Sequence, residues 1–249
     1  LYMKKISSDL ERIFYDSEIF KYDYIYIYSD LRYYLIKYGN HFSKNLLNLF
    51  LNKKKTIIVP TFSYTAFGNF YKDKTKSALG FFSNYILNNK KSYRSKHPLF
   101  SFAAIGPKKN ILKNLGKSAF GNNGLHKTLY KKNACYLHIG RPLKQGNTMV
   151  HFFEKKYNVN YRYEKKFPTK VFEKKKYLGT NYSAYLRYLN MKNNHFKFKK
   201  AYKIIKNKKF VKSYNIRNKF RGIEIYPYDK IFDTFDELIK KNKSIFIEK

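Results

Sequence analysis

The repeated alternation of short apolar runs with longer helical patterns is the feature of this 249-residue chain that most constrains its fold. Uninterrupted apolar runs predict strands covered on both faces, and they occur at 22–29, 56–60, 101–105 and 135–139. Helical patterning follows these runs, at 30–51, 76–88, from Gly106-Pro107 onward and at 148–157. Successive strand–helix units predict an α/β protein, layered α/β/α around a largely parallel central sheet.

The segments on either side of this core are patterned less regularly. Ser8 and Glu11 have capping-box spacing, which predicts a helix before the first strand. After Tyr157, short aromatic and lysine-rich runs predict hairpin strands near a sheet edge. A lysine-rich helix, a strand and a last helix are expected at 191–207, 220–226 and 228–241. Because no Gly/Ser/Pro-rich linker intervenes, we expect a single domain over 1–249, with a motif-bearing core at 8–157 and a less clearly patterned part at 158–249.

Charge limits the partners of the chain. Lys and Arg number 53 against 16 Asp and Glu, a formal net charge of +37. Clustered Lys and Arg neutralise phosphates, so an anionic partner such as nucleic acid is one explanation. The other is an A/T-rich genome, because Lys, Asn, Ile, Phe and Tyr dominate the composition. In both cases the surface attracts phosphate-bearing ligands and repels polycations.

The single cysteine and the hydropathy pattern bear on the compartment. Cys135 lies in an apolar run that predicts a buried strand, so no disulfide framework is expected. No stretch reaches the roughly 18 apolar residues of a membrane span, and the N-terminal residues lack the apolar region of a secretory signal. We therefore expect a cytoplasmic protein without a membrane partner.

Polar loops follow the predicted strands, where open α/β sheets bind their ligands. These loops contain Ser29, Asp30, Leu31 and Arg32, then 61–64, then 94–98, and finally 140–154. Backbone amides and hydroxyls at helix starts bind carbonyls and phosphates. The four loops are therefore the expected ligand site.

In the last loop, His151 and Glu154 lie three positions apart at the start of a predicted helix, so both face the same side. A neutral imidazole can remove a proton from an amine or hydroxyl near neutral pH, and a neighbouring carboxylate can orient it. Asn147 and Thr148 occupy the capping positions of this helix. The same spacing also fits a structural histidine at a helix start, with Glu154 as a solvated partner.

The other motifs in the sequence do not indicate a catalytic, metal-binding or nucleotide-binding site. Cys135 and His138 point to opposite faces of a strand, so they cannot form a nucleophile–base pair. No cluster of Cys, His, Asp or Glu has ligand spacing, and no metal is expected. The sequence lacks the glycine-rich phosphate-binding motifs of ATPases and of dinucleotide-binding domains. Lysine runs with interleaved Tyr and Phe fit single-stranded nucleic acid, but they are scattered and accompany no known binding signature.

Four ordered motifs resemble the aminoglycoside 3-N-acetyltransferase family, whose fold is unrelated to that of the GNAT acetyltransferases. Residues 27–32 (IYSDLR) are similar to the family's H-S-[SD]-L-R, and 59–64 (VPTFSY) to its M-P-T-F-[ST]-Y. Residues 94–107 follow R-S-x-H-P-x-x-S-x-A-x-x-G-P, and 147–154 follow N-T-x-x-H-x-x-E. The resemblance, which covers residues 8–157, implies an acetyl-CoA-dependent N-acetyltransferase that acts on an aminoglycoside or amino sugar.

The resemblance also implies roles for the loop residues. His151 is the general base for the acceptor amine in a direct transfer from acetyl-CoA, and Glu154 orients it. The residues expected along the acetyl-CoA path are Ser29, Leu31, Arg32, Thr61, Arg94 and Ser95. Those expected at the acceptor are Asp30, Tyr64 and Asn147. His97 is expected to support its loop and not to react.

Three positions depart from the family pattern near the acceptor. Tyr28 replaces a frequent His, Asp30 a frequent Ser and Gly124 a usual Ser. Because acidic residues that would bind a polycation are few, we expect an amino sugar that bears a phosphate or nucleotide. An aminoglycoside is the acceptor that the resemblance alone implies. The alternatives are a basic nucleic-acid-binding protein and a catalytically inactive relative.

Overall fold

A central mixed sheet organises the computed structural model, which describes residues 10–191, 195–214 and 222–247. Within these residues seven strands form this sheet, in the order β11-β12-β6-β1-β2-β5-β4. In chain order they are β1 (Tyr24–Ser29), β2 (Thr56–Pro60), β4 (Tyr93–Arg94), β5 (Phe102–Ile105), β6 (Ala134–Ile139), β11 (Lys212–Tyr214) and β12 (Ile223–Pro227). The strands predicted at 22–29, 56–60, 101–105 and 135–139 are therefore all present.

The strand directions are more varied than the sequence predicted. β1 pairs in parallel with β2 and with β6, so the three central strands run in the same direction. β5 is antiparallel to β2, and β12 is antiparallel to β6. The α/β class is confirmed, but the expected parallel alignment holds only at the centre of the sheet. Seven residues separate β4 from β5, which is too short for a crossover and forces an antiparallel return.

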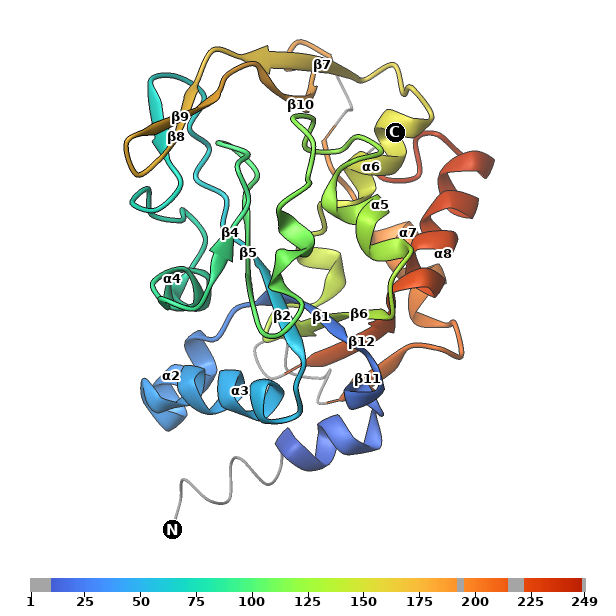
Figure 1. Cartoon of the computed structure of the whole chain (residues 1–249). Helices are drawn as coiled ribbons and strands as arrows, with labels where there is room; N and C mark the ends of the chain where they lie inside the picture. The colour runs from blue at the N-terminus through green and yellow to red at the C-terminus, as the bar shows by residue number, and fades with distance from the viewer. Residues whose placement is uncertain (1–9, 192–194, 215–221, 248–249) are drawn as a thin grey trace.

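Helices cover both faces of this sheet, as the layered prediction requires (Figure 1). Tyr24, Tyr26 and Tyr28 point to one face of β1, and Ile25 and Ile27 point to the other. The isoleucine face packs against residues 10–16, α2 (Arg32–Tyr38), α3 (His41–Asn52) and α4 (Phe81–Leu87). The tyrosine face packs against α5 (Leu125–Tyr130), α6 (Met149–Lys156), α7 (Lys199–Lys206) and α8 (Tyr228–Lys241). These two apolar clusters are the hydrophobic core around the central sheet.

Several predicted helices differ in their bounds. The helix expected over 30–51 is divided into α2 and α3, because Gly39 has a φ of 71°, a left-handed conformation that ends a helix. The helix expected after Pro107 is a short 3-10 turn, Lys109–Leu112. Two further 3-10 turns are Ile19–Lys21 and Leu143–Gln145.

The C-terminal part adds β11 and β12 to the central sheet, and its residues 162–187 contribute to two small separate sheets. β7 (Arg162–Phe167) pairs antiparallel with β10 (Tyr182–Arg187). β8 (Lys170–Glu173) and β9 (Lys176–Gly179) form a hairpin, which β3 (Asn69–Tyr71) joins in parallel. The predicted hairpin strands are present, and α8 spans the predicted residues. Ser8 of the capping box, positions 192–194 of the lysine-rich helix and positions 220–221 of the last strand lie outside the described residues.

Candidate active site

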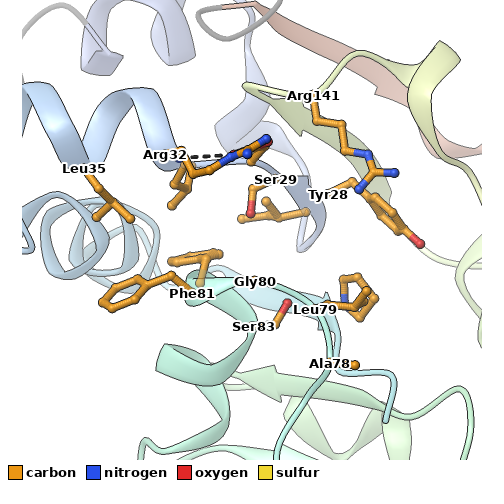
Figure 2. Close-up of a pocket in the computed structure, with 15 residues that line it drawn as sticks. Tyr28, Ser29, Arg32, Leu35, Ala78, Leu79, Gly80, Phe81, Ser83 and Arg141 are labelled. Atoms are coloured by element: carbon orange, nitrogen blue, oxygen red, sulfur yellow. Dashed lines mark hydrogen bonds and ion pairs between the residues drawn. The ribbon is translucent and has the colours of Figure 1, made fainter. Parts of the chain in front are cut away.

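A first cavity, of about 310 Å³, opens where β1 ends and α2 begins. Ser29, Leu31 and Arg32 line it, as does residue segment 78–83 from across the space. Figure 2 shows Ser29 and Arg32 on one side and Phe81 and Ser83 on the other. The structure therefore brings together three of the residues that the sequence assigned to acetyl-CoA.

Asp30 also lines this first cavity, where it is paired with Arg32. The Arg32 Nε lies 2.9 Å from Asp30 Oδ1, and the Arg32 backbone amide lies 3.2 Å from the same oxygen. Hydrogen bonding from Arg32 holds the pKa of Asp30 below its usual value. The Arg32 side chain is 76% exposed, so its guanidinium keeps donors for a ligand. The sequence placed Asp30 at the acceptor, but the structure groups it with the residues expected to bind acetyl-CoA.

A second cavity, of about 380 Å³, adjoins the first and contains His151. Tyr64 and Asn147, both expected at the acceptor, line this second cavity. Three residues line both cavities: Tyr28, Leu79 and Arg141. A group held between the cavities would therefore lie beside these three side chains.

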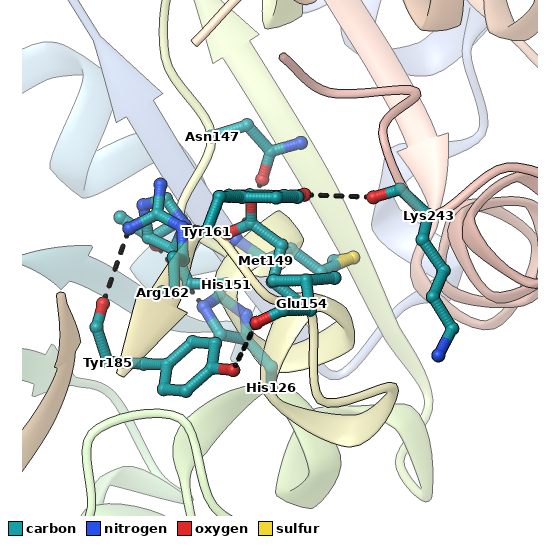
Figure 3. Close-up of polar contacts among 11 residues, drawn as sticks. His126, Asn147, Met149, His151, Glu154, Tyr161, Arg162, Tyr185 and Lys243 are labelled. Atoms are coloured by element: carbon teal, nitrogen blue, oxygen red, sulfur yellow. Dashed lines mark hydrogen bonds and ion pairs between the residues drawn. The ribbon is translucent and has the colours of Figure 1, made fainter. Parts of the chain in front are cut away.

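His151 and Arg162 both contact the buried carboxylate of Glu154, and Figure 3 shows the three residues. His151 Nδ1 lies 2.6 Å from Glu154 Oε2, and Arg162 Nε lies 2.7 Å from the same oxygen. Glu154 is fully buried, whereas the His151 side chain is 20% exposed. The carboxylate fixes the Nδ1–H tautomer, so Nε2 is the ring nitrogen with a free lone pair. Within the described part of the chain, Nε2 has no hydrogen-bond partner.

The surroundings of His151 favour its neutral form. Burial lowers the pKa of His151, and the positive charge of Arg162 lowers it further, while Glu154 acts in the opposite direction. Glu154 stays ionised, because His151 and Arg162 together overcome the effect of burial and lower its pKa. The site therefore presents a neutral imidazole and a charged carboxylate at neutral pH.

A second histidine lies behind this pair. His126 is buried, with its Nδ1 2.8 Å from Tyr228 Oη and its Nε2 3.2 Å from Thr148 Oγ1. Thr148 is the N-cap residue of α6, so this chain of contacts connects the start of α6 to α5 and α8. Burial lowers the pKa of His126 to about 3, which keeps it neutral. It supports the helix that carries His151.

Three predicted acetyl-CoA residues, Thr61, Arg94 and Ser95, are buried and line neither of the two cavities. Arg94 Nε donates to Ser101 Oγ at 3.0 Å, and its Nη2 donates to the Thr61 carbonyl at 2.8 Å. Ser95 Oγ accepts the Phe102 amide at 2.9 Å. Their polar groups are thus used to hold the loop at β4 and β5.

His97 has the supporting position that the sequence predicted. Its Nδ1 accepts the backbone amides of Leu99 and Phe100 at 3.2 and 3.1 Å, and its Nε2 donates to the Ser183 carbonyl at 2.9 Å. Burial lowers its pKa to about 4. Cys135 and His138 belong to the cores on opposite faces of β6, as expected, and form no reactive pair.

Sequence reasoning did not find the arginines of the second cavity. Arg141, Arg162 and Arg187 all line it, although they come from the end of β6, from β7 and from the end of β10. No sequence motif connects these positions. Only the pairing of Arg162 with Arg187 across β7 and β10 brings the last two together.

The described residues contain neither a metal-binding cluster nor a membrane-spanning helix. In that part of the chain, no group of three or more His, Cys, Asp and Glu side chains is placed to hold a metal ion. Nor does any helix there combine the length and apolar character needed to cross a membrane.

The fold is that of known acetyltransferase structures. The chain is similar to a sisomicin-bound structure of AAC-VIa, with a TM-score of 0.77 at 14% identity, covering 94% of this chain and 97% of that one. It is similar to the structure of AAC-IIIb with CoASH, with a TM-score of 0.76 at 10% identity, covering 94% and 96%. The YokD protein from Bacillus subtilis gives a TM-score of 0.68 at 15% identity, covering 89% and 88%. No curated protein matches in sequence.

The family follows from the sequence match. A family model for aminoglycoside 3-N-acetyltransferase matches residues 37–234, which is most of the chain. The chain therefore belongs to the aminoglycoside 3-N-acetyltransferase family, as the four motifs indicated. Membership makes it an N-acetyltransferase with acetyl-CoA as the co-substrate.

Proposed function

We propose that this chain transfers the acetyl group of acetyl-CoA directly to an amine of an amino sugar, with His151 as the general base. The observation that carries this proposal is the position of His151. It is fixed by the buried Glu154 and lines a cavity that adjoins the one containing Ser29 and Arg32. Both substrates can then be bound together, so no acetylated enzyme is needed.

The two ring nitrogens of His151 have different roles in the proposed transfer. The acceptor nitrogen attacks the thioester carbonyl carbon, a C–N bond forms, and the C–S bond breaks to release CoA. His151 Nε2 takes a proton from the attacking nitrogen, and this proton passes to the departing thiolate or to water. Glu154 stabilises the resulting imidazolium through Nδ1 and remains ionised, since its pKa is lowered.

We infer that acetyl-CoA binds at the first cavity. Arg32 is exposed and presents guanidinium donors to a phosphate, and Ser29 and Leu31 line the same cavity. The adjoining acceptor cavity is the one that contains Tyr64 and Asn147. Asp30 then positions Arg32, and Thr61, Arg94 and Ser95 support the loops from behind.

The Tyr28 hydroxyl is suited to stabilise the negative charge that develops on the thioester oxygen. It lines both cavities, and burial raises its pKa to about 12, so the phenol stays protonated. A protonated hydroxyl beside the reacting carbonyl can donate a hydrogen bond to the oxyanion. Tyr28 replaces a residue that is often His in the family, and this role gives the replacement a function.

The test is an assay of thiol release from acetyl-CoA with a panel of amino sugars and aminoglycosides. His151→Ala should lower kcat about 10²- to 10⁴-fold, the range typical of a lost general base. His41→Ala is the control, because His41 is exposed at the start of α3 and lies outside both cavities. If His151→Ala kept the full rate with a good acceptor, the assignment of the base would be wrong.

A further inference from the structure

The acceptor cavity has a marked positive charge. Its lining includes Arg141, Arg162 and Arg187, whereas none of the described residues that line it is Asp or Glu. The first cavity differs, because its Arg32 is already paired with Asp30. A cavity that lacks carboxylates is poorly suited to a polycationic acceptor.

The three arginines are not equally neutralised. Arg162 is compensated by the buried Glu154, 2.7 Å from its Nε. Arg141 Nη2 donates to the Gln145 carbonyl at 2.7 Å, and Arg187 Nη1 lies 3.0 Å from His195 Nδ1. A carbonyl and an imidazole carry no negative charge. Within the described residues, neither Arg141 nor Arg187 is in an ion pair.

The register of β7 and β10 adds an independent observation. Arg187 is directly opposite Arg162 in this antiparallel pair, so the two side chains share one face. Like charges at directly opposed positions destabilise a sheet. Glu154 offsets one of these charges and leaves the other to face the cavity. An anion bound between Arg187 and Arg141 would supply the missing negative charge.

The geometry points to an acceptor amine that carries an anionic group, a phosphate or a carboxylate, bound by Arg187 and Arg141 while the amine faces His151. This inference rests on the proposed function. A guanidinium binds phosphate and carboxylate oxygens through paired N–H donors, which suits both forms of the anion. Tyr64 and Phe196 line the same cavity with 52% and 37% of their surface exposed, and their rings offer apolar faces to a sugar.

The experiment compares glucosamine, glucosamine 6-phosphate, 2-amino-2-deoxyglucuronic acid and sisomicin as acceptors, by thiol release at fixed ionic strength. The two anionic sugars separate phosphate from carboxylate. We expect kcat/KM for at least one of them to exceed that for glucosamine by about tenfold or more, since hydrogen bonds to charged groups are strong. In Arg187→Glu this preference should be lost, and turnover of sisomicin should rise.

Lys165→Glu is the matched control, because it makes the same change of charge at an exposed position of β7 outside the cavity. It should keep the preference for the anionic sugar. An equal or greater kcat/KM for sisomicin and glucosamine, unchanged by Arg187→Glu, would overturn the inference while leaving the acetyltransferase reaction intact. Absence of thiol release with any amine, together with failure to bind acetyl-CoA, would instead contradict the proposed function.

A binding measurement decides the inference if none of the four sugars is turned over. With CoA saturating, so that its own phosphate site is filled, thermal unfolding is followed with glucosamine and with glucosamine 6-phosphate. Selective stabilisation by the phosphate sugar in the parent chain and in Lys165→Glu, but not in Arg187→Glu, supports the anion site. Equal effects in all three proteins would overturn it.

Discussion

The two adjoining cavities differ in how the chain builds them and in how their charges are balanced. The first is formed mainly by two continuous segments, 27–35 and 78–83, and its exposed Arg32 is matched by Asp30. The second is assembled from β7, β10 and the loops around α6, and its Arg141 and Arg187 face neutral partners. On the proposed function, the site for the constant co-substrate acetyl-CoA is thus built from short continuous segments, whereas the site for the acceptor depends on tertiary pairing.

The largest effect is expected at the buried ion pair of Glu154 and Arg162 beside His151. Glu154→Gln should lower the free energy of unfolding by about 3–5 kcal/mol, because Arg162 would be left buried without its counter-charge. It should also lower kcat at least about tenfold, since His151 loses the carboxylate that orients it. Denaturant unfolding and thiol release measure the two losses separately.

Two further variants separate stability from catalysis at this pair. Glu154→Gln with Arg162→Met removes both buried charges and should recover much of the stability, but not the rate. Glu164→Gln alters a partly exposed carboxylate that pairs with Lys155, so it should cost about 1 kcal/mol or less. A double variant with full activity would show that Glu154 acts only in folding.

A smaller effect, confined to one substrate, is expected at the first cavity. Arg32→Ala should raise KM for acetyl-CoA about tenfold, because it removes the exposed guanidinium proposed to bind a phosphate. KM for the acceptor should not change, since Arg32 does not line the second cavity. Lys37→Ala, on the same helix but outside both cavities, is the control. An equal rise in both KM values would contradict the separation of the two sites.

The smallest effect is a displacement of the pH profile. Because burial and Arg162 lower the pKa of His151, the base stays neutral below its ordinary value of 6.5, and kcat/KM should fall only at lower pH. Glu154 raises this pKa, so the acid limb of Glu154→Gln should lie at still lower pH. Both proteins are measured with the same acceptor, so that the titration of the acceptor amine affects the two pH profiles equally. The titration of the acceptor amine can itself give a limb above pH 6.5, so the test is the difference between the two profiles. A limb at higher pH in Glu154→Gln than in the parent chain would contradict the assignment of His151 as the base.

The sequence predicted the strands well and their directions less well. Apolar runs define β1, β2, β5 and β6, because a strand covered on both faces must be apolar on every position. Burial does not depend on strand direction, so β5 and β12 looked the same as parallel strands. β3 was missed because only Phe70 of its three residues is buried.

For the site, local motifs located His151 with Glu154 and the loop at Ser29 to Arg32. These residues are close in sequence, and helix or turn geometry alone brings them together. The same motifs assigned Arg94 to acetyl-CoA, but its guanidinium is buried against Ser101 and Thr61 and lines neither cavity. Arg162 and Arg187 could not be found, because a distant strand register places them.

The place of Arg141 between the two cavities has a consequence for the affinities of the two ligands. Arg141 lines both the first and the second cavity. A charged ligand in one cavity therefore changes the electrostatic potential in the other. Such linkage is reciprocal: whatever factor CoA imposes on acceptor affinity, the acceptor must impose on CoA. We expect titration calorimetry to register this interdependence as substrate synergy, and Arg141→Met to make the two affinities independent.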